Sequence, residues 1–224
     1  SVNEIRKICD AQAITDATFE HILPYIREGV TEREIALEIE FYMRKLGADG
    51  NAFDPIVVTG GNGSQCHGIP GDTVIKKGDF ITMDTGAMLR GYHSDMTRTV
   101  ALGYVSDEQK AVYDTVLKAQ LAAIDAVHAG VCCSDVDKVA RDIIETPYPG
   151  TFGHGLGHGV GFEIHEWPRF SARDNTICEP GMVITVEPGI YIAGKCGVRI
   201  EDMIVVTEDG CRNLTHSPKA LMIL

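Results

Sequence analysis

Four carboxylates in apolar, strand-like stretches are the side chains of this chain with the clearest chemical potential. Asp84 follows an apolar run, and Asp95 lies on the stretch that returns after a glycine-containing turn signal. Glu187 and Glu201 occupy comparable positions around a second turn at Gly194. Directly opposed hairpin residues have Cβ atoms roughly 4.5–5.5 Å apart, so each pair is expected to place two carboxylates face to face. Partly buried carboxylates at that distance repel one another and lose hydration, which predicts a cation between them.

His158 adds one nitrogen ligand to this oxygen-rich set and lies in the glycine-rich segment 153–161. Glycines on both sides of a residue let backbone and ligand approach closely. Four carboxylates balance the charge of two divalent ions, and this donor set favours Mn²⁺, Fe²⁺ or Co²⁺, with Zn²⁺ as a further option. Two such ions about 3.5–4 Å apart acidify a shared water and stabilise the oxyanion of a carbonyl addition. The pattern therefore predicts a dinuclear hydrolytic centre.

Simpler interpretations of these residues exist. A single acidic pair could be neutralised by a nearby arginine, either Arg98 or Arg199, but two pairs at equivalent positions favour a metal centre. Periodicity alone leaves His165 undecided, because residues seven apart on a regular strand face opposite sides. A bulge or bend between His158 and His165 is required if both side chains reach one site.

The elements that must position these residues follow the same order twice. In the first half, helices are expected over residues 2–27 and 31–47, a strand over 56–59, and a hairpin over 79–88 and 93–102. In the second half, helices are expected over 106–128 and 134–146, and a hairpin over 182–192 and 198–207.

The repeat is also visible residue by residue. The segment 78–86 matches the segment 181–189, so that Asp84 aligns with Glu187 at an offset of 103 positions, 187 minus 84. The same offset carries the helix-capping Thr31 to Ser134, which is expected to cap its helix together with Asp137. We therefore predict one α+β domain with an internal pseudo-twofold helix–helix–hairpin repeat.

Composition limits the other classes of function. The chain has 224 residues and a formal net charge of -12, and an acidic chain is a poor candidate for binding nucleic acid or anionic membranes. No apolar run is long enough to cross a bilayer. The seven cysteines include no C-x-x-C pair, which argues against a disulfide framework or a thiolate zinc site and favours a cytoplasmic location.

Taken together, these segments resemble the pita-bread metallopeptidases, which include methionyl aminopeptidase, aminopeptidase P and prolidase. The resemblance covers essentially the whole chain and rests on residues 83–86, 92–99, 157–159, 186–189 and 199–202. It implies a curved antiparallel sheet covered by helices, with two divalent ions, most simply Mn²⁺. The ligands that it implies are Asp84, Asp95, His158, Glu187 and Glu201.

Within this family the sequence resembles the Xaa-Pro branch, that is, Xaa-Pro dipeptidase or Xaa-Pro aminopeptidase. Tyr191, Arg199 and His154 carry this closer resemblance, whereas the loop around His67 is common to both branches. It implies removal of the N-terminal residue from dipeptides or peptides with proline in second position.

The resemblance also implies roles for these residues. Glu187 would carry the proton to the leaving nitrogen, and His165 and His67 would hydrogen-bond the substrate and the tetrahedral intermediate. The remaining three, His154, Tyr191 and Arg199, would shape the prolyl side of the site or orient the metal ligands.

Two alternatives stay open at this point. One is a methionyl aminopeptidase with the same chemistry on another substrate, and the other is a metal-free peptide-binding module on the same fold. The intact set of ligand positions favours the enzymes. Full-length Xaa-Pro peptidases usually carry a further N-terminal domain, so residues 1–224 are expected to be the catalytic C-terminal part of a longer protein that forms a homodimer.

Overall fold

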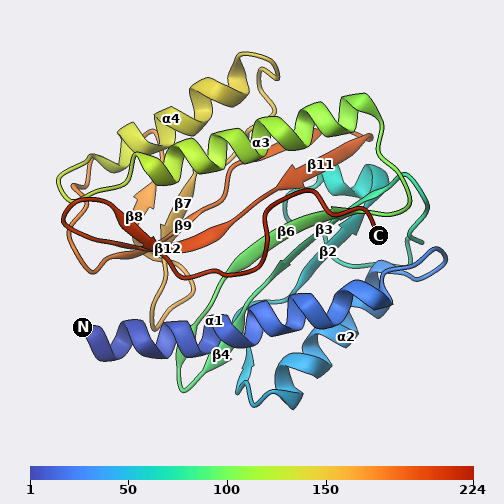
Figure 1. Ribbon diagram of the computed structural model, residues 1–224, viewed down its shortest axis with the longest axis horizontal. Helices are drawn as coiled ribbons and strands as arrows, with labels where there is room; N and C mark the ends of the chain where they lie inside the picture. The colour runs from blue at the N-terminus through green and yellow to red at the C-terminus, as the bar shows by residue number, and fades with distance from the viewer.

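The computed structural model describes all 224 residues and shows two pairs of helices packed on a set of curved antiparallel strands (Figure 1). The helices are α1 (Val2–Ile22), α2 (Glu32–Lys45), α3 (Asp107–Asp125) and α4 (Cys133–Glu145), with 3-10 turns η1 (Leu23–Tyr25) and η2 (Gly60–Ser64). No helix is both long and apolar enough to span a lipid bilayer.

The strands divide into two comparable groups. Those of the first half are β1 (Gly50–Asn51), β2 (Ile56–Thr59), β3 (Phe80–Thr85), β4 (Ala87–Leu89), β5 (Tyr92–His93) and β6 (Met96–Ala101). Those of the second half are β7 (Gly157–Gly159), β8 (Glu166–Phe170), β9 (Val183–Val186), β10 (Gly189–Ile192), β11 (Cys196–Arg199), β12 (Asp202–Val206) and β13 (Cys211–Asn213). The orders β2-β3-β6 and β13-β12-β9-β7-β8 are antiparallel throughout.

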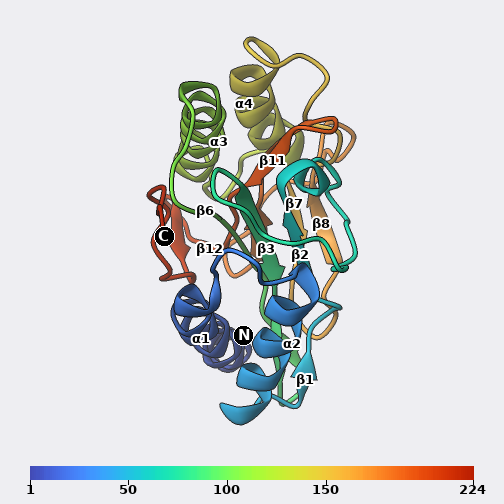
Figure 2. The same ribbon diagram turned by 90° about the vertical axis from the view of Figure 1, so that its right-hand side faces the viewer.

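Each half of the molecule has its own apolar core. Ile35, Ile39 and Ile81 are buried between α1, α2 and the strands of the first half. Val116 and Ile184 are buried between α3, α4 and the strands of the second half. Figure 2 shows the two helix pairs at opposite ends of the molecule with the strands between them. The predicted α+β architecture with two similar halves is thereby confirmed.

The first helix pair follows the predicted boundaries except at the end of α1. Thr31 and Glu34 form the expected capping box, in which the Thr31 hydroxyl accepts from the Glu34 amide at 3.2 Å. Helix α2 ends at Lys45, before Gly47 with φ +99°. Helix α1 was expected to reach residue 27 but ends at Ile22, because Pro24 cannot continue the hydrogen-bond ladder and the chain tightens into η1.

In the second helix pair, one predicted N-cap is wrong. Ser106 caps α3 as expected, although α3 ends at Asp125 rather than near 128. The N-cap of α4 is Cys132, not Ser134, because the Cys133 amide already donates to the Thr176 carbonyl. Asp137 therefore lies inside the helix as a buried side chain instead of completing a capping box.

The backbone hydrogen bonds show where the internal repeat truly aligns. The Glu32 amide donates to the Thr73 carbonyl at 3.0 Å, and the Cys133 amide donates to the Thr176 carbonyl at 2.9 Å. The bridge of Thr31 with Val74 likewise corresponds to the bridge of Cys132 with Ile177. The equivalent of Thr31 is thus Cys132, so the offset at the helix start is two positions shorter than the offset of 103 at the strands.

The first hairpin has a different register from the one expected. Its turn is centred between Arg90 and Gly91, whose φ angles are 53° and 78°, whereas direct pairing of Asp84 with Asp95 required a centre one residue earlier, between Leu89 and Arg90. Asp84 consequently pairs with Thr97 and not with Asp95. The prediction that Asp84 and Asp95 face each other directly is wrong, and the two lie on a diagonal, where neighbouring residues are roughly 7–8 Å apart.

The second hairpin has the register that the sequence predicted. Val186 pairs with Asp202 and Gly189 pairs with Arg199. These pairs share one register, which places Glu187 opposite Glu201 in the interval between them. The turn at Gly194 has φ +70°, a conformation that favours glycine.

Candidate metal centre

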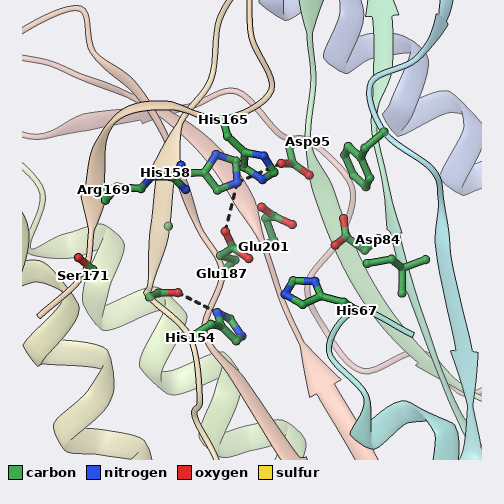
Figure 3. Close-up of a pocket in the computed structure, with 14 residues that line it drawn as sticks. His67, Asp84, Asp95, His154, His158, His165, Arg169, Ser171, Glu187 and Glu201 are labelled. Atoms are coloured by element: carbon green, nitrogen blue, oxygen red, sulfur yellow. Dashed lines mark hydrogen bonds and ion pairs between the residues drawn. The ribbon is translucent and has the colours of Figure 1, made fainter. Parts of the chain in front are cut away.

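The ten candidate site residues predicted from the sequence all belong to one region. Each of them either lines or supports a cavity of about 460 Å³ between the two halves (Figure 3). The predicted residues that line it are His67, Asp84, Asp95, His154, His158, His165, Glu187 and Glu201. The other two, Tyr191 and Arg199, do not line the cavity but bond directly to residues that do.

The five expected metal ligands come from strand ends of both halves. Asp95 lies just before β6, His158 is in β7, and Glu201 lies between β11 and β12. One ligand atom from each of these three can be chosen so that all lie within 4.8 Å of one another. His158 Nε2 is also 3.4 Å from Glu187 Oε1, and Asp84 lies near the end of β3 on the facing wall (Figure 3).

Two buried oxygen atoms in this group have no hydrogen-bond partner, namely Asp84 Oδ1 and Glu201 Oε1. A buried acceptor without a partner is costly, so an unpaired carboxylate oxygen is expected to meet a cation. Both atoms belong to residues of the oxygen-rich set that divalent metals of the Mn²⁺ type prefer. The residues present therefore fit a metal centre.

The electrostatics of the carboxylates lead to the same conclusion. Burial and the nearby Asp84 and Glu187 charges raise the pKa of Asp95. Burial and the neighbouring Asp95 and Glu187 charges likewise raise the pKa of Glu201. Such carboxylates resist ionisation unless positive charge is supplied, and a divalent ion supplies it.

Arg199 orients two of the acidic side chains from behind the cavity. Its Nη2 donates to Asp84 Oδ2 at 2.7 Å, and its Nε donates to the Thr97 hydroxyl at 3.0 Å. That hydroxyl in turn donates to Glu201 Oε2 at 2.7 Å. Arg199, one of the two arginines considered as a counter-ion, thus neutralises part of the Asp84 charge. It leaves Asp84 Oδ1 free for a metal ion.

The other candidate arginine, Arg98, does not enter the cavity. Its guanidinium pairs with buried Asp202 at 2.7 Å, and it donates to the carbonyl oxygen of Ser217 at 2.7 Å. The positive charge of Arg98 therefore does not neutralise the acidic side chains of the cavity.

A chain of hydrogen bonds continues from Arg199 to His154. Arg199 Nη1 donates to the Tyr191 hydroxyl at 2.8 Å, so that hydroxyl donates its own proton to His154 Nε2 at 2.9 Å. The opposite ring nitrogen, Nδ1, then donates to the Gly155 carbonyl at 2.8 Å. Burial and the Arg199 charge lower the pKa of His154 to about 4, which keeps the ring neutral and in this single tautomer.

His165 and His67 approach the cavity from two separate segments. The β7–β8 pairing shifts register between His158 and Gly159, which is the irregularity required for His165 to reach the site. The His165 ring lies edge-on to the His158 ring with centroids 4.4 Å apart. His67 follows η2 and lies on an exposed loop at the cavity wall (Figure 3).

Four cavity residues escaped the sequence argument: Phe53, Ile56, Arg169 and Ser171. The available signal for Arg169 was the alternation in β8, where exposed Trp167 and Arg169 alternate with buried Pro168 and Phe170. The Arg169 guanidinium forms no ion pair, and it extends into the cavity near His158 (Figure 3). A cationic group without a protein partner at a cavity wall is suited to an anionic ligand group.

Residues 6–208 match the model of metallopeptidase family M24. The chain belongs to metallopeptidase family M24. Membership in this family implies a divalent metal ion, and the cluster of Asp95, His158 and Glu201 is the candidate place for it.

Similar proteins place the chain within the M24 family more closely. A solved Xaa-Pro dipeptidase from Bacillus anthracis is 49% identical with a TM-score of 0.98, covering 100% of this chain and 63% of that one. A solved X-Pro aminopeptidase from Thermotoga maritima MSB8 is 44% identical with a TM-score of 0.98, covering 100% and 64%. The Xaa-Pro dipeptidase of Pyrococcus furiosus is 43% identical over 219 residues, covering 97% and 62%.

These similarities confirm the resemblance to the Xaa-Pro branch of M24 and the pita-bread fold. They also show that the chain spans less than two thirds of the length of each of these relatives.

Proposed function

We propose that this M24 domain carries the active site of a two-metal Xaa-Pro peptidase, which removes the N-terminal residue when proline stands second. The observation that carries the proposal is the convergence of five metal-type ligands and three further histidines in one cavity. The similarity to Xaa-Pro dipeptidases and an X-Pro aminopeptidase supports the choice of substrate class.

The proposed ligands fall into three roles. Asp84 would hold one ion, His158 and Glu187 the other, and Asp95 and Glu201 both. The ions supply an acidified water and an electrophile for the substrate carbonyl when bound. Four carboxylates and one imidazole favour Mn²⁺, with Co²⁺, Fe²⁺ or Zn²⁺ as substitutes.

Glu187 is the proposed carrier of the proton to the leaving nitrogen. The nitrogen of an Xaa-Pro bond belongs to a tertiary amide and must be protonated before it leaves. The Thr185 hydroxyl at 3.1 Å and His158 Nε2 at 3.4 Å both meet Glu187 Oε1. Oε2 is thereby left available for proton transfer.

His165 and His67 are the proposed donors to the substrate and to the developing oxyanion. Burial and the adjacent His158 lower the pKa of His165, so that His165 acts as a neutral imidazole near neutral pH. A neutral imidazole can donate one hydrogen bond without adding a second positive charge beside the metal ions. His67 lies on an exposed loop and can adjust to the substrate.

His154 forms the proposed wall on the prolyl side, and Tyr191 and Arg199 support it from behind the cavity. Because one hydrogen-bond chain joins their side chains, the wall is held in one geometry before substrate arrives. Arg169 is placed to bind the free carboxylate of a dipeptide, since its guanidinium faces the cavity without an acidic partner. Dipeptides are therefore the proposed preferred substrates.

A peptide panel with added Mn²⁺ tests this proposal. We expect cleavage of Ala-Pro, slower cleavage of Ala-Pro-Ala, and the slowest cleavage of Met-Ala-Ser, because a single shaped pocket discriminates by about 10–200-fold. A preference for Met-Ala-Ser would instead assign the chain to methionyl aminopeptidases. Absence of both metal binding and turnover would leave a peptide-binding module.

Two finer expectations stay predictions. The seven cysteines are all free thiols, which supports a reducing, cytoplasmic location. A homodimer of the full-length protein is expected from the family resemblance, and light scattering of that protein would test it.

A further inference from the structure

An arginine–aspartate pair inside α4 lies directly behind the wall that carries His154. Arg141 Nε donates to Asp137 Oδ2 at 2.8 Å, and Arg141 Nη2 donates to Asp137 Oδ1 at 2.9 Å. The Asp137 side chain is 1% exposed and that of Arg141 is 28% exposed. Two parallel hydrogen bonds of this kind fix the orientation of both side chains.

The same two side chains hydrogen-bond the backbone of the segment 152–156. Arg141 Nη1 donates to the Phe152 carbonyl at 2.9 Å, and Arg141 Nη2 donates to the His154 carbonyl at 2.8 Å. Asp137 Oδ1 accepts from the Leu156 amide at 3.1 Å. Three alternate residues of the segment are thus tied to one side-chain pair, which we term the α4 clasp (Asp137 and Arg141).

Side-chain packing strengthens the link between the α4 clasp and His154. The Arg141 guanidinium lies over the Phe152 ring at 4.4 Å, and the Phe152 and His154 rings meet edge to face at 5.0 Å. A shift of Arg141 therefore moves both the backbone and one ring neighbour of His154. From His154 the hydrogen-bond chain continues through Tyr191 to Arg199.

The first half of the molecule contains a comparable arrangement. Glu32, at the start of α2, is fully buried and accepts from the Thr59 amide at 2.8 Å and the Gly71 amide at 3.1 Å. Those two amides lie at opposite ends of the loop that carries His67. In both halves, a buried carboxylate on the second helix thus holds a loop that presents a histidine to the cavity.

A surface pair on the same helix shows that ion pairing alone does not explain the α4 clasp. Lys138 and Asp142 have the same spacing of four residues, but their side chains are 67% and 64% exposed. Exposed pairs of this type contribute little, whereas burying Asp137 and Arg141 has a desolvation cost. The backbone bonds to 152–156 are what the buried pair provides in addition.

We propose that Asp137 and Arg141 are positioning residues for the prolyl-side wall of the cavity, and that they act by fixing the place of His154. The proposal rests on the proposed function for the role of His154 in substrate binding. It predicts that loosening the α4 clasp impairs recognition of the Xaa-Pro substrate while leaving the metal ligands in place.

Kinetics of Arg141→Lys test the functional part, with Lys138→Gln as the matched surface control on α4. Lysine cannot make the bidentate pair and both carbonyl contacts together. We expect KM for Ala-Pro to rise on the order of 10-fold, which is at the lower end of the effects seen when a residue that supports a binding group is lost. The values of kcat and of Mn²⁺ affinity should change little. Lys138→Gln should behave as the wild type.

A double-mutant cycle shows whether the effect passes through His154. In a His154→Ala background, Arg141→Lys should cause no further rise in KM, because the group that it positions is absent. If the two effects multiply instead, the α4 clasp does not act through His154 and the proposal is overturned.

Amide hydrogen exchange gives a readout that requires no turnover. We expect faster exchange over 152–156 in Arg141→Lys than in Lys138→Gln, in both the metal-free and Mn²⁺-loaded protein. Equal exchange in the two variants would overturn the α4 clasp. A wild-type domain without Xaa-Pro cleavage would overturn the proposed function, and the exchange comparison would still decide whether the α4 clasp holds the segment.

Should Arg141→Lys fold poorly, the double variant Asp137→Asn with Arg141→Gln replaces it. This variant removes both buried charges together and so avoids an unpaired ion in the interior. The same faster exchange over 152–156 is expected of it, and exchange as slow as in Lys138→Gln would contradict the proposal.

Discussion

At the scale of single residues, Glu187 combines two properties that are usually separated. One of its oxygens, Oε1, accepts a hydrogen bond from the Thr185 hydroxyl and lies 3.4 Å from His158 Nε2. Burial raises its pKa, whereas the His158 and Arg199 charges oppose that rise. A carboxylate balanced in this way is suited both to binding a cation and to accepting and releasing a proton.

Replacing Glu187 by glutamine is expected to abolish most turnover and to weaken metal binding. The substitution keeps the size of the side chain but removes its charge and its basicity. Glu179→Gln, at an exposed position of the second half, is the matched control for loss of one negative charge. Steady-state kinetics and Mn²⁺ titration measure both effects, and a Glu187→Gln enzyme with ordinary turnover would exclude the proton-transfer role.

His165→Ala should have a different signature. We expect both metal ions to remain bound and turnover to fall on the order of 10²–10³-fold, the usual effect of removing an oxyanion donor. His128→Ala, at an exposed position after α3, is the control. Near-normal turnover of His165→Ala at full metal occupancy would show that this histidine does not stabilise the intermediate.

The sequence was sufficient to predict that the proposed ligand residues meet in one cavity, but not to predict every residue of the cavity wall. Asp84, Glu187 and His158 stand in distinctive local motifs, so their convergence could be predicted without coordinates. Arg169 and Ser171 lie in an edge strand and the loop after it, where the alternation that exposes Arg169 does not distinguish a cavity residue from a surface residue.

At the scale of secondary-structure elements, the predictions were most accurate where local chemistry decides. The capping box of Thr31 and the turn at Gly194 follow from local bonding and from glycine's freedom at positive φ. The register of the first hairpin and the cap of α4 depend on a one-residue choice of turn and on a bond from Cys133 to the distant Thr176. Neither can be read from neighbouring residues alone.

Asp202, which begins β12, connects elements of both halves. Asp202 Oδ1 accepts from Arg98, and its Oδ2 accepts from Lys219 at 2.7 Å and from Gln120 of α3 at 3.0 Å. Burial opposes ionisation of Asp202, but the Arg98 and Lys219 charges outweigh it and hold the pKa below its usual range. The folded state therefore prefers the ionised form.

This preference predicts a defined dependence of stability on pH. Because the pKa is lower in the folded protein, the stabilisation is complete above the ordinary aspartate value of about 3.9 and is lost as pH falls through the folded value. Asp202→Asn should lower the unfolding free energy of the metal-free protein by about 3–5 kcal/mol at neutral pH, since Arg98 is left unpaired. The difference in unfolding free energy between the wild type and Asp202→Asn should become smaller at acidic pH.

Urea denaturation of the metal-free protein across pH measures this effect. Asp114→Asn is the control, because Asp114 pairs with Lys110 on the exposed face of α3 and such pairs contribute about 0–1 kcal/mol. A wild-type advantage over Asp202→Asn that stays constant down to the most acidic folded condition would contradict the assigned role of the carboxylate.

At the scale of the whole molecule, the internal repeat explains how one domain assembles a charged cavity. Each half contributes a hairpin with acidic residues near its strand ends, and the halves join where the Thr99 hydroxyl donates to the Arg199 carbonyl at 3.0 Å. The Glu201 amide also donates to the Thr97 carbonyl at 3.1 Å. Neither half holds the whole set of proposed ligands, so the proposed metal centre requires both halves to be folded together.

The stoichiometry of Mn²⁺ bound to the chelator-stripped and reloaded domain tests the central claim most directly. Equilibrium dialysis with elemental analysis should give two ions per wild-type chain, and fewer in Asp84→Asn, which lacks one proposed ligand charge. The Glu179→Gln control should match the wild type. Zero or one ion per wild-type chain at saturation would contradict the two-metal centre.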